Sequence, residues 1–238
     1  MLWAIAALTA FFVKGLCGFA NTLVFTSVLG FTAANVNISP VELLLGYPSN
    51  LIQTWKNRGS LKSEVYIPLI LLVLAGSIPG ALLLKNTDVH SLKVVFGIAV
   101  ICIGLEMLAR EYGILTKRSS KFILTLLGFL SGLLCGLFGV GALLAAYVGR
   151  TTDTGDAFKA NIGAVFAAEN TVRIVIYCML GIITQEALKQ AILLVPFMAA
   201  GMYAGMKSAE VLDEKLVKKL VILLLILSGA SLVGLNLH

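Results

Sequence analysis

The chain has 238 residues, of which 59% are hydrophobic and only 13% charged, and its mean hydropathy is +0.98. Charged residues make up about a quarter of soluble domains, so this composition excludes a soluble globular protein and predicts an integral membrane protein. The formal net charge of +6 sits mostly in short loops, which suits loops beside anionic lipid and argues against nucleic-acid binding.

Apolar runs follow one another along the chain, and most approach the ~20 residues that a helix needs to cross ~30 Å of hydrocarbon. They do not alternate with a period of two, which argues against the strands of a transmembrane barrel. The first run lacks a basic start and a small-residue cleavage site, so we interpret it as retained structure. We predict eight helical segments, at residues 2–31, 41–55, 65–84, 92–108, 122–148, 157–180, 187–206 and 216–235.

The first and fifth runs are longer than a membrane crossing requires. A continuous helix over residues 2–31 would be about 45 Å long at 1.5 Å per residue. We expect such a segment to tilt, break or turn back at the glycines that crowd the middle of these runs. They are Gly15 and Gly18 in the first run, and Gly136, Gly139 and Gly141 in the fifth.

The sequence also repeats itself. GLCGFANTLV at 15–24 aligns with GLFGVGALLA at 136–145, and AGSIPG at 75–80 aligns with AGMYAG at 200–205. Close helix packing through small residues is the favoured interpretation of the second pair of patches. We predict an all-α membrane protein with two homologous four-segment repeats, at 1–109 and 122–238, joined by a basic linker at 110–121.

Basic residues help to choose between a crossing and a re-entrant first segment. If all eight segments cross, eight basic residues lie on each side, contrary to the positive-inside rule. If the first segment of each half is a re-entrant pair of half-helices, thirteen lie on one side and only Lys85, Lys93 and Lys189 on the other. This count predicts inverted repeats with external termini and a cytoplasmic linker. A tilted eight-crossing bundle is the alternative.

The sixth run contains Glu169, Asn170 and Arg173 in an otherwise apolar stretch. An intramembrane Arg costs ~2.5–3.5 kcal/mol on insertion scales and therefore normally faces protein or water and has a partner. Glu169 lies four residues earlier, on the same helical face. The pair either neutralises itself and holds helices together, or Arg173 binds an anionic oxygen group while Glu169 orients it or exchanges a proton.

Lys14 is a second buried cation, beside the glycines of the first run, unless its side chain snorkels to the membrane surface. Asn21 and Thr22 would lie in the first turn after the break, where unpaired N–H groups attract anions. Together these features predict a midplane anion site between the halves. Its expected residues are Lys14, Gly18, Asn21, Tyr47, Asn50, Gln53, Gly139, Gly141, Asn170 and Arg173, with Glu169 for proton coupling.

Other ionisable residues receive ordinary interpretations. Glu42 and Glu106 lie nearer to segment ends and are expected at the interface, with a proton-carrying role for either residue as the alternative. Residues 153–159 are expected to form a solvated loop with a helix cap. No metal, disulfide or cofactor is predicted, because the cysteines lack CxxC spacing and read as small core residues. The sequence leaves the oligomeric state open, a homodimer included. The cysteines are Cys17, Cys102, Cys135 and Cys178.

The two glycine patches, together with KANIGAVFAAENTVRIVIYCMLGIIT in the second half, resemble the sulfite exporter TauE/SafE family of bacterial and archaeal membrane permeases. The resemblance covers nearly the whole chain. It implies a protein of the cytoplasmic membrane that moves sulfite, sulfonates or other organosulfur anions, usually as an exporter. It also implies about eight crossings, in tension with re-entrant first segments. By position it assigns the patches to Gly15, Gly18 and Phe19, and to Gly136, Gly139 and Gly141.

One departure from the family pattern stands out: Ala20 and Asn21 occupy positions where members commonly have further glycines. The two halves therefore need not bind substrate equivalently. The leading hypothesis is a secondary transporter of small sulfur oxyanions, with proton coupling through Glu169 as a further hypothesis. A passive anion channel is the alternative, and an enzyme is disfavoured because no nucleophile with a buried base is found. No GxxxxGK[ST] motif for a nucleotide occurs in the chain.

Overall fold

The computed structural model describes residues 1–29, 35–83, 94, 97–98, 101–102, 104–105, 108–109, 121–138 and 141–234, and within these ranges the chain forms helices and no strands. Three described helical stretches are long and apolar enough to cross a membrane, at Ser63–Gly80, Gly155–Met179 and Gln185–Val211. The predicted all-helical membrane protein is confirmed at this level. Most of the fourth predicted run, 92–108, lies outside the described residues.

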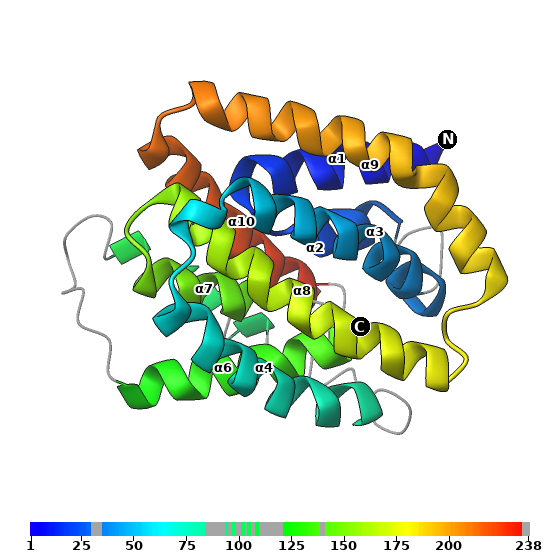
Figure 1. Ribbon diagram of the computed structural model, residues 1–238, viewed down its shortest axis with the longest axis horizontal. Helices are drawn as coiled ribbons and strands as arrows, with labels where there is room; N and C mark the ends of the chain where they lie inside the picture. The colour runs from blue at the N-terminus through cyan, green and yellow to red at the C-terminus, as the bar shows by residue number, and fades with distance from the viewer. Residues whose placement is uncertain are drawn as a thin grey trace.

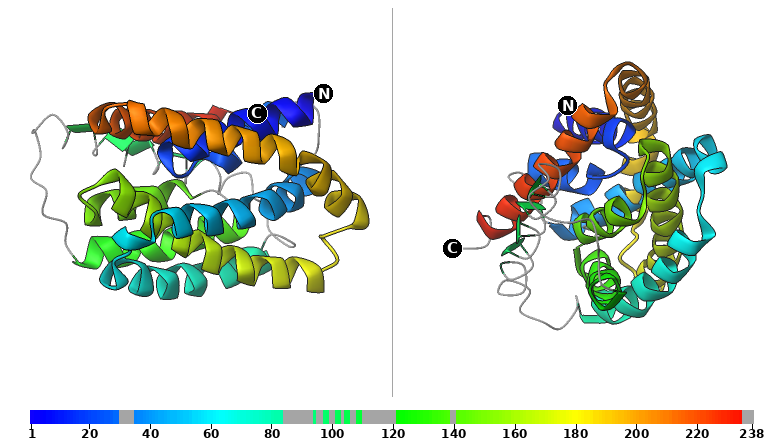
Figure 2. Two further views of the ribbon diagram at one scale, coloured as in Figure 1. Left: turned by 45° about the horizontal axis from the view of Figure 1, so that its top comes forward. Right: turned by 90° about the vertical axis from the view of Figure 1, so that its left-hand side faces the viewer.

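Helices run along the longest axis of the molecule (Figures 1 and 2). The elements are α1 Leu2–Cys17, α2 Asn21–Leu29, α3 Asn35–Lys56, the 3-10 turn η1 Arg58–Ser60, α4 Ser63–Leu83, α6 Lys121–Phe138, α7 Ala142–Thr151, α8 Gly155–Met179, α9 Gln185–Val211 and α10 Glu214–Gly234. Two of the predicted runs, 2–31 and 122–148, are thus each divided between two helices. Helix α3 begins six residues before the predicted run and contains both Pro40 and Pro48.

The chain reverses direction between α1 and α2. Gly18, with φ at 91°, and Ala20, with φ at 71°, both adopt the left-handed conformation, which glycine reaches at little cost. On one continuous helix Trp3 and Phe25 would be ~33 Å apart at 1.5 Å per residue. Their ring centroids are 5.9 Å apart instead, in an edge-to-face contact. Helix α2 therefore runs back alongside α1.

Two close helix pairs join the halves of the chain. In the pair α1 and α9, a Cβ added to Gly201 would collide with the carbonyl of Leu8, and one added to Gly205 with that of Phe12. In the pair α4 and α6, a Cβ at Gly76 would collide with the carbonyl of Phe129. The predicted small-residue packing of AGSIPG and AGMYAG is confirmed. Each pair joins the first helix of one half to the third long helix of the other.

Helices α3 and α8 lie between these two pairs and run antiparallel (Figure 1). Ser39, near the start of α3, lies 3.2 Å from the hydroxyl of Tyr177, near the end of α8. At the opposite end, Gln53 of α3 donates to the carbonyl of Lys159 near the start of α8, at 2.9 Å. Helix α3 of the first half and helix α8 of the second half are thus packed against each other in opposite directions.

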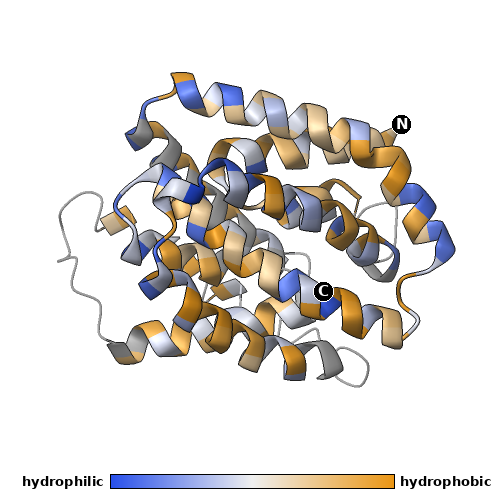
Figure 3. Cartoon of the chain, in the orientation of Figure 1, coloured by the Kyte–Doolittle hydropathy of each residue, from blue (hydrophilic) through white to orange (hydrophobic). Residues whose placement is uncertain are grey.

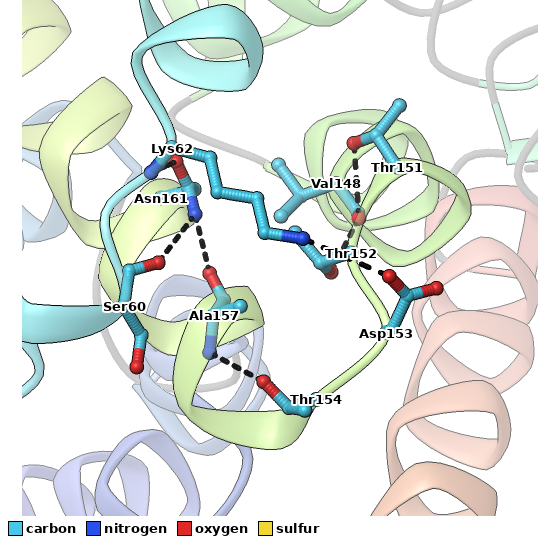
Figure 4. A network of polar contacts seen from close by, with 9 residues as sticks. All are labelled: Ser60, Lys62, Val148, Thr151, Thr152, Asp153, Thr154, Ala157 and Asn161. Carbon is cyan, nitrogen blue, oxygen red and sulfur yellow. Dashed lines mark hydrogen bonds and ion pairs between the residues drawn. The ribbon is translucent and has the colours of Figure 1, made fainter.

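Loops from both halves meet at one end of the bundle. Lys56 forms an ion pair with Glu210 at 2.9 Å, and Lys62 one with Asp153 at 3.7 Å. Asn161, which is fully buried, donates to the carbonyl of Ser60 and accepts from the backbone N–H of Lys62 (Figure 4). These contacts place residues 56–62, 150–159 and 207–210 on the same side of the molecule.

The solvated loop and helix cap predicted for residues 153–159 are found at Asp153 and Thr154, whereas residues 155–159 already belong to α8, with Ala157 and Phe158 buried. The Asp153 side chain is 91% exposed. The hydroxyl of Thr154 accepts from the backbone N–H of Ala157 at 3.2 Å and caps α8 (Figure 4). Hydrophilic residues gather at such helix ends. A further group of hydrophilic residues lies part of the way along the otherwise apolar helix α8 (Figure 3).

Candidate functional site

Four ionisable side chains are buried in the helical core that the structure describes. They are Lys14 of α1, Glu42 of α3, and Glu169 and Arg173 of α8, each at most 4% exposed. Charged groups are almost never buried this deeply without partners, because transfer out of water is expensive. The contacts that surround them therefore define the candidate site.

Glu169 and Arg173 lie one helical turn apart, and Arg173 Nε is 3.4 Å from Glu169 Oε1. The predicted ion pair is confirmed. The guanidinium also donates to Asn170 Oδ1 at 2.9 Å and to the carbonyl of Cys135 at 3.3 Å. Within the described residues, however, Arg173 Nε and both carboxylate oxygens of Glu169 have no hydrogen-bond partner. Buried polar atoms in that condition call for a ligand, a water or a proton.

Lys14 does not snorkel to the surface. Its Nζ donates to Asn50 Oδ1 at 2.5 Å and to Asn21 Oδ1 at 3.3 Å, and it lies 5.9 Å from the centroid of the Phe166 ring. Asn21 begins α2, Asn50 belongs to α3 and Phe166 to α8. Lys14 therefore joins the first half of the chain to the core of the second.

The expectation that Glu42 lies at the membrane interface is wrong. The side chain is 3% exposed, and its Oε1 accepts from Asn21 Nδ2 at 2.5 Å and from Thr22 Oγ1 at 2.8 Å. The reason is that α3 begins at Asn35, which places Glu42 two turns inside the helix. Glu42 is thus a buried functional candidate that the sequence analysis left out of the predicted site, and its signal was a lone carboxylate at the edge of an apolar run.

The polar groups of the two halves meet beside Gly46 of α3. A Cβ at this position would lie 3.3 Å from Glu42 Oε1, and 3.6 Å from both Asn170 Nδ2 and Asn21 Nδ2. Glycine therefore leaves room for amides from α2 and α8 to approach the carboxylate of α3. We call the set formed by Lys14, Asn21, Thr22, Glu42, Asn50, Glu169, Asn170 and Arg173 the central cluster.

Gln53 of α3 and Arg173 of α8 make similar contacts with backbone carbonyls. Gln53 Nε2 donates to the carbonyl of Gly18 at 2.9 Å, and Arg173 donates to the carbonyl of Cys135. Carbonyls at the end of a helix have no partner within that helix. Helix α3 thus supplies a donor at the end of α1, and α8 supplies a donor at the end of α6. Of these two donors, only Arg173 of α8 is charged.

The remaining predicted site residues lie at or outside the edge of the central cluster. Tyr47 is half-buried, and its hydroxyl accepts from exposed Thr171 at 3.4 Å. A Cβ at Gly18 would contact the side chain of Lys159, and one at Gly141 would fall on the Phe166 ring that faces Lys14. Gly139 and Glu106 lie outside the described residues.

Cysteine and metal chemistry add nothing to this site. Cys17 and Cys135 are buried, and Cys102 and Cys178 are exposed. Among the residues that the structure describes, no group of three His, Cys, Asp or Glu side chains could hold a metal ion.

Membrane-length helices around a buried charged cluster, contributed by both ends of the chain, define the class of membrane permeases. The model of the sulfite exporter TauE/SafE family matches residues 3–232, so this chain belongs to that family. No curated protein and no solved structure matches it. The family consists of membrane transporters of sulfur anions such as sulfite, and this chain is accordingly a membrane transporter whose partners are a small anion and the lipid bilayer.

Proposed function

We propose that this chain is a secondary transporter that exports small sulfur oxyanions, such as sulfite or organosulfonates, through the central cluster. The observation that carries the proposal is Arg173, buried in α8, whose Nε is ion-paired with the Glu169 carboxylate although neither group makes a hydrogen bond there. A guanidinium presents a planar fork of donors that matches the oxygens of a sulfite or sulfonate group. Asn170 and Lys14 supply further donors from α8 and α1.

We also propose that Glu169 couples transport to protons. In the ionised form its carboxylate holds Arg173 at 3.4 Å. A proton on Glu169 would remove that charge and leave the guanidinium free to bind the substrate. Movement of an anion together with a proton also lowers the cost of carrying net charge through a medium of low dielectric constant.

The architecture that we propose is a pair of inverted repeats with re-entrant first helices. Three observations support it: α2 runs back alongside α1, α3 and α8 are antiparallel, and basic loops of both halves meet at one end. An eight-crossing bundle would place residues 56–62 and 207–210 on opposite sides. We assign the basic end and the linker at 110–121 to the cytoplasm, with external termini in an inner membrane.

The site as described is built from one chain, so the proposal does not require a homodimer. It is tested by uptake of radiolabelled sulfite and a small panel of sulfonates into proteoliposomes, with and without an imposed pH gradient. We expect accumulation that depends on the gradient and is lost in Arg173→Gln. Flux that never exceeds equilibrium would indicate a passive channel, and no flux of any panel member through folded protein would refute the substrate class.

A further inference from the structure

We propose that Glu42 is a tethered internal anion, which occupies part of the substrate position when the transporter is empty and leaves it when protonated. This inference rests on the proposed function and adds a second carboxylate to it, with a different role from Glu169. Glu42 would compete with the substrate, whereas Glu169 would control Arg173.

The first observation is the set of donors that holds this carboxylate. Glu42 Oε1 accepts from Asn21 Nδ2 and Thr22 Oγ1, the side chains of the first turn of α2. The start of a helix favours negative charge, and hydroxyl and amide donors are those that an oxyanion requires. Lys14 Nζ donates to the amide oxygen of the same Asn21 at 3.3 Å. Glu42 is thus bound in the way that a free anion would be bound.

The second observation lies across the cluster, on α8. Asn170 Nδ2 approaches the position beside Gly46 that Glu42 Oε1 also approaches, and Asn170 Oδ1 accepts from Arg173. The Glu42 carboxylate and the Asn170 amide therefore both lie beside Gly46, where groups of α3 and α8 come together. Arg173 Nε and the Glu169 carboxylate, both buried in the same cluster, make no hydrogen bond, and buried polar atoms in that condition call for a ligand, a water or a proton.

The third observation is the charge balance. Among the buried residues that the structure describes, Lys14 and Arg173 are cationic and Glu42 and Glu169 are acidic, so the ionised cluster has two charges of each sign and no net charge. An additional anion would be uncompensated in a medium of low dielectric constant. Protonation of one carboxylate restores the balance.

The proposed step is a proton-linked exchange at one position. The Glu42 carboxylate takes up one proton from water, its hydrogen bonds with Asn21 and Thr22 break, and one substrate anion accepts from these donors. Release of the anion returns the proton to water. The titratable groups that face Glu42 are Lys14 of α1, Arg173 and Glu169 of α8 and Cys135 of α6, and within the described residues α2 contributes none.

A thermal-unfolding experiment tests the vacated position without assuming the substrate. Wild type, Glu42→Ala and the exposed-site control Glu186→Gln are purified in detergent and unfolded with sodium acetate or with bulky sodium gluconate. We expect acetate to raise the unfolding midpoint of Glu42→Ala in a saturable manner, and to leave wild type and the control unchanged. Equal responses of all three proteins to acetate would overturn the inference.

A binding experiment covers the case in which Glu42→Ala does not fold. Methanesulfonate affinity is measured against pH for wild type, Glu42→Gln and Glu169→Gln, because this anion keeps its charge over the range used. Competition predicts that binding weakens with rising pH in wild type on the alkaline side, and that Glu42→Gln binds more tightly with a shallower pH slope, because only Glu169 still titrates in that variant. An unchanged pH slope in Glu42→Gln would refute the inference.

The two proposals fail in different ways. If acetate stabilises Glu42→Ala while wild type neither binds nor transports sulfite or sulfonates, the tethered anion stands and the proposed substrate class falls. If wild type transports sulfite and Glu42→Gln keeps both its affinity and its pH slope, the substrate class stands and Glu42 is only a structural residue of the α2–α3 contact.

Discussion

Replacement of Arg173 by Gln separates the charge of this residue from its structural contact. Gln53 of α3 makes a similar contact with the carbonyl of Gly18, so a Gln at 173 can still donate to the carbonyl of Cys135. The charge is lost. Hydrogen bonds to a charged group contribute about 1.5–3 kcal/mol, so we expect sulfite to bind about 10- to 100-fold more weakly.

The same variant leaves Glu169 buried without its cation, which costs about 3–5 kcal/mol when the carboxylate is ionised. We therefore expect a lower unfolding midpoint for Arg173→Gln, and a midpoint restored in the double variant Arg173→Gln with Glu169→Gln. Sulfite affinity should remain low in both proteins. Calorimetric titration in detergent and thermal unfolding check these outcomes. Wild-type affinity in folded Arg173→Gln would show that the Glu169–Arg173 pair only holds helices together.

Three further predictions follow from the fold and the central cluster. Glu169→Gln should retain sulfite exchange at equal pH but lose accumulation driven by a pH gradient, and flux assays in which the gradient still drives uptake would exclude this residue as the coupling group. Gly205→Ala should destabilise the protein by about 1–3 kcal/mol, because its Cβ collides with the α1 backbone, whereas Gly59→Ala meets nothing within 4 Å and serves as the control in thermal unfolding. In a cysteine-free background, Arg58→Cys and Lys207→Cys should both react with a membrane-impermeant thiol reagent from the cytoplasmic side, and labelling from opposite sides would contradict the inverted arrangement.

Sequence patterns within single segments predicted the local features of the structure correctly. The spacing of four residues predicted the Glu169–Arg173 pair, the small-residue patches predicted close helix packing without naming the partner helices, and the composition predicted the membrane class. These features depend on one helix face or on local sterics. They need no knowledge of which helices become neighbours.

Features that depend on how the helices are arranged could not be predicted from the sequence. Glu42 was expected near the interface because it lies at the start of the predicted run 41–55, yet α3 begins at Asn35 and accommodates Pro40 in its interior. Lys14 could either snorkel or be buried, and the choice depends on Asn50, which is distant in sequence. Tyr47 lies one residue from Pro48 in a polar stretch but on the face that meets Thr171, away from the buried charges.

The exchange of partners between the halves bears on how access could alternate between the two sides of the membrane. Because α1 packs against α9 and α4 against α6 with backbones in contact, these pairs are the natural rigid bodies, and each contains helices from both halves. A rocking of one sequence half against the other would have to break both contacts at once. Relative motion would then fall along the surfaces of α3 and α8, whose contacts include polar ones such as Ser39 with Tyr177 and Gln53 with the carbonyl of Lys159. The moving parts of this transporter would then not coincide with its repeats.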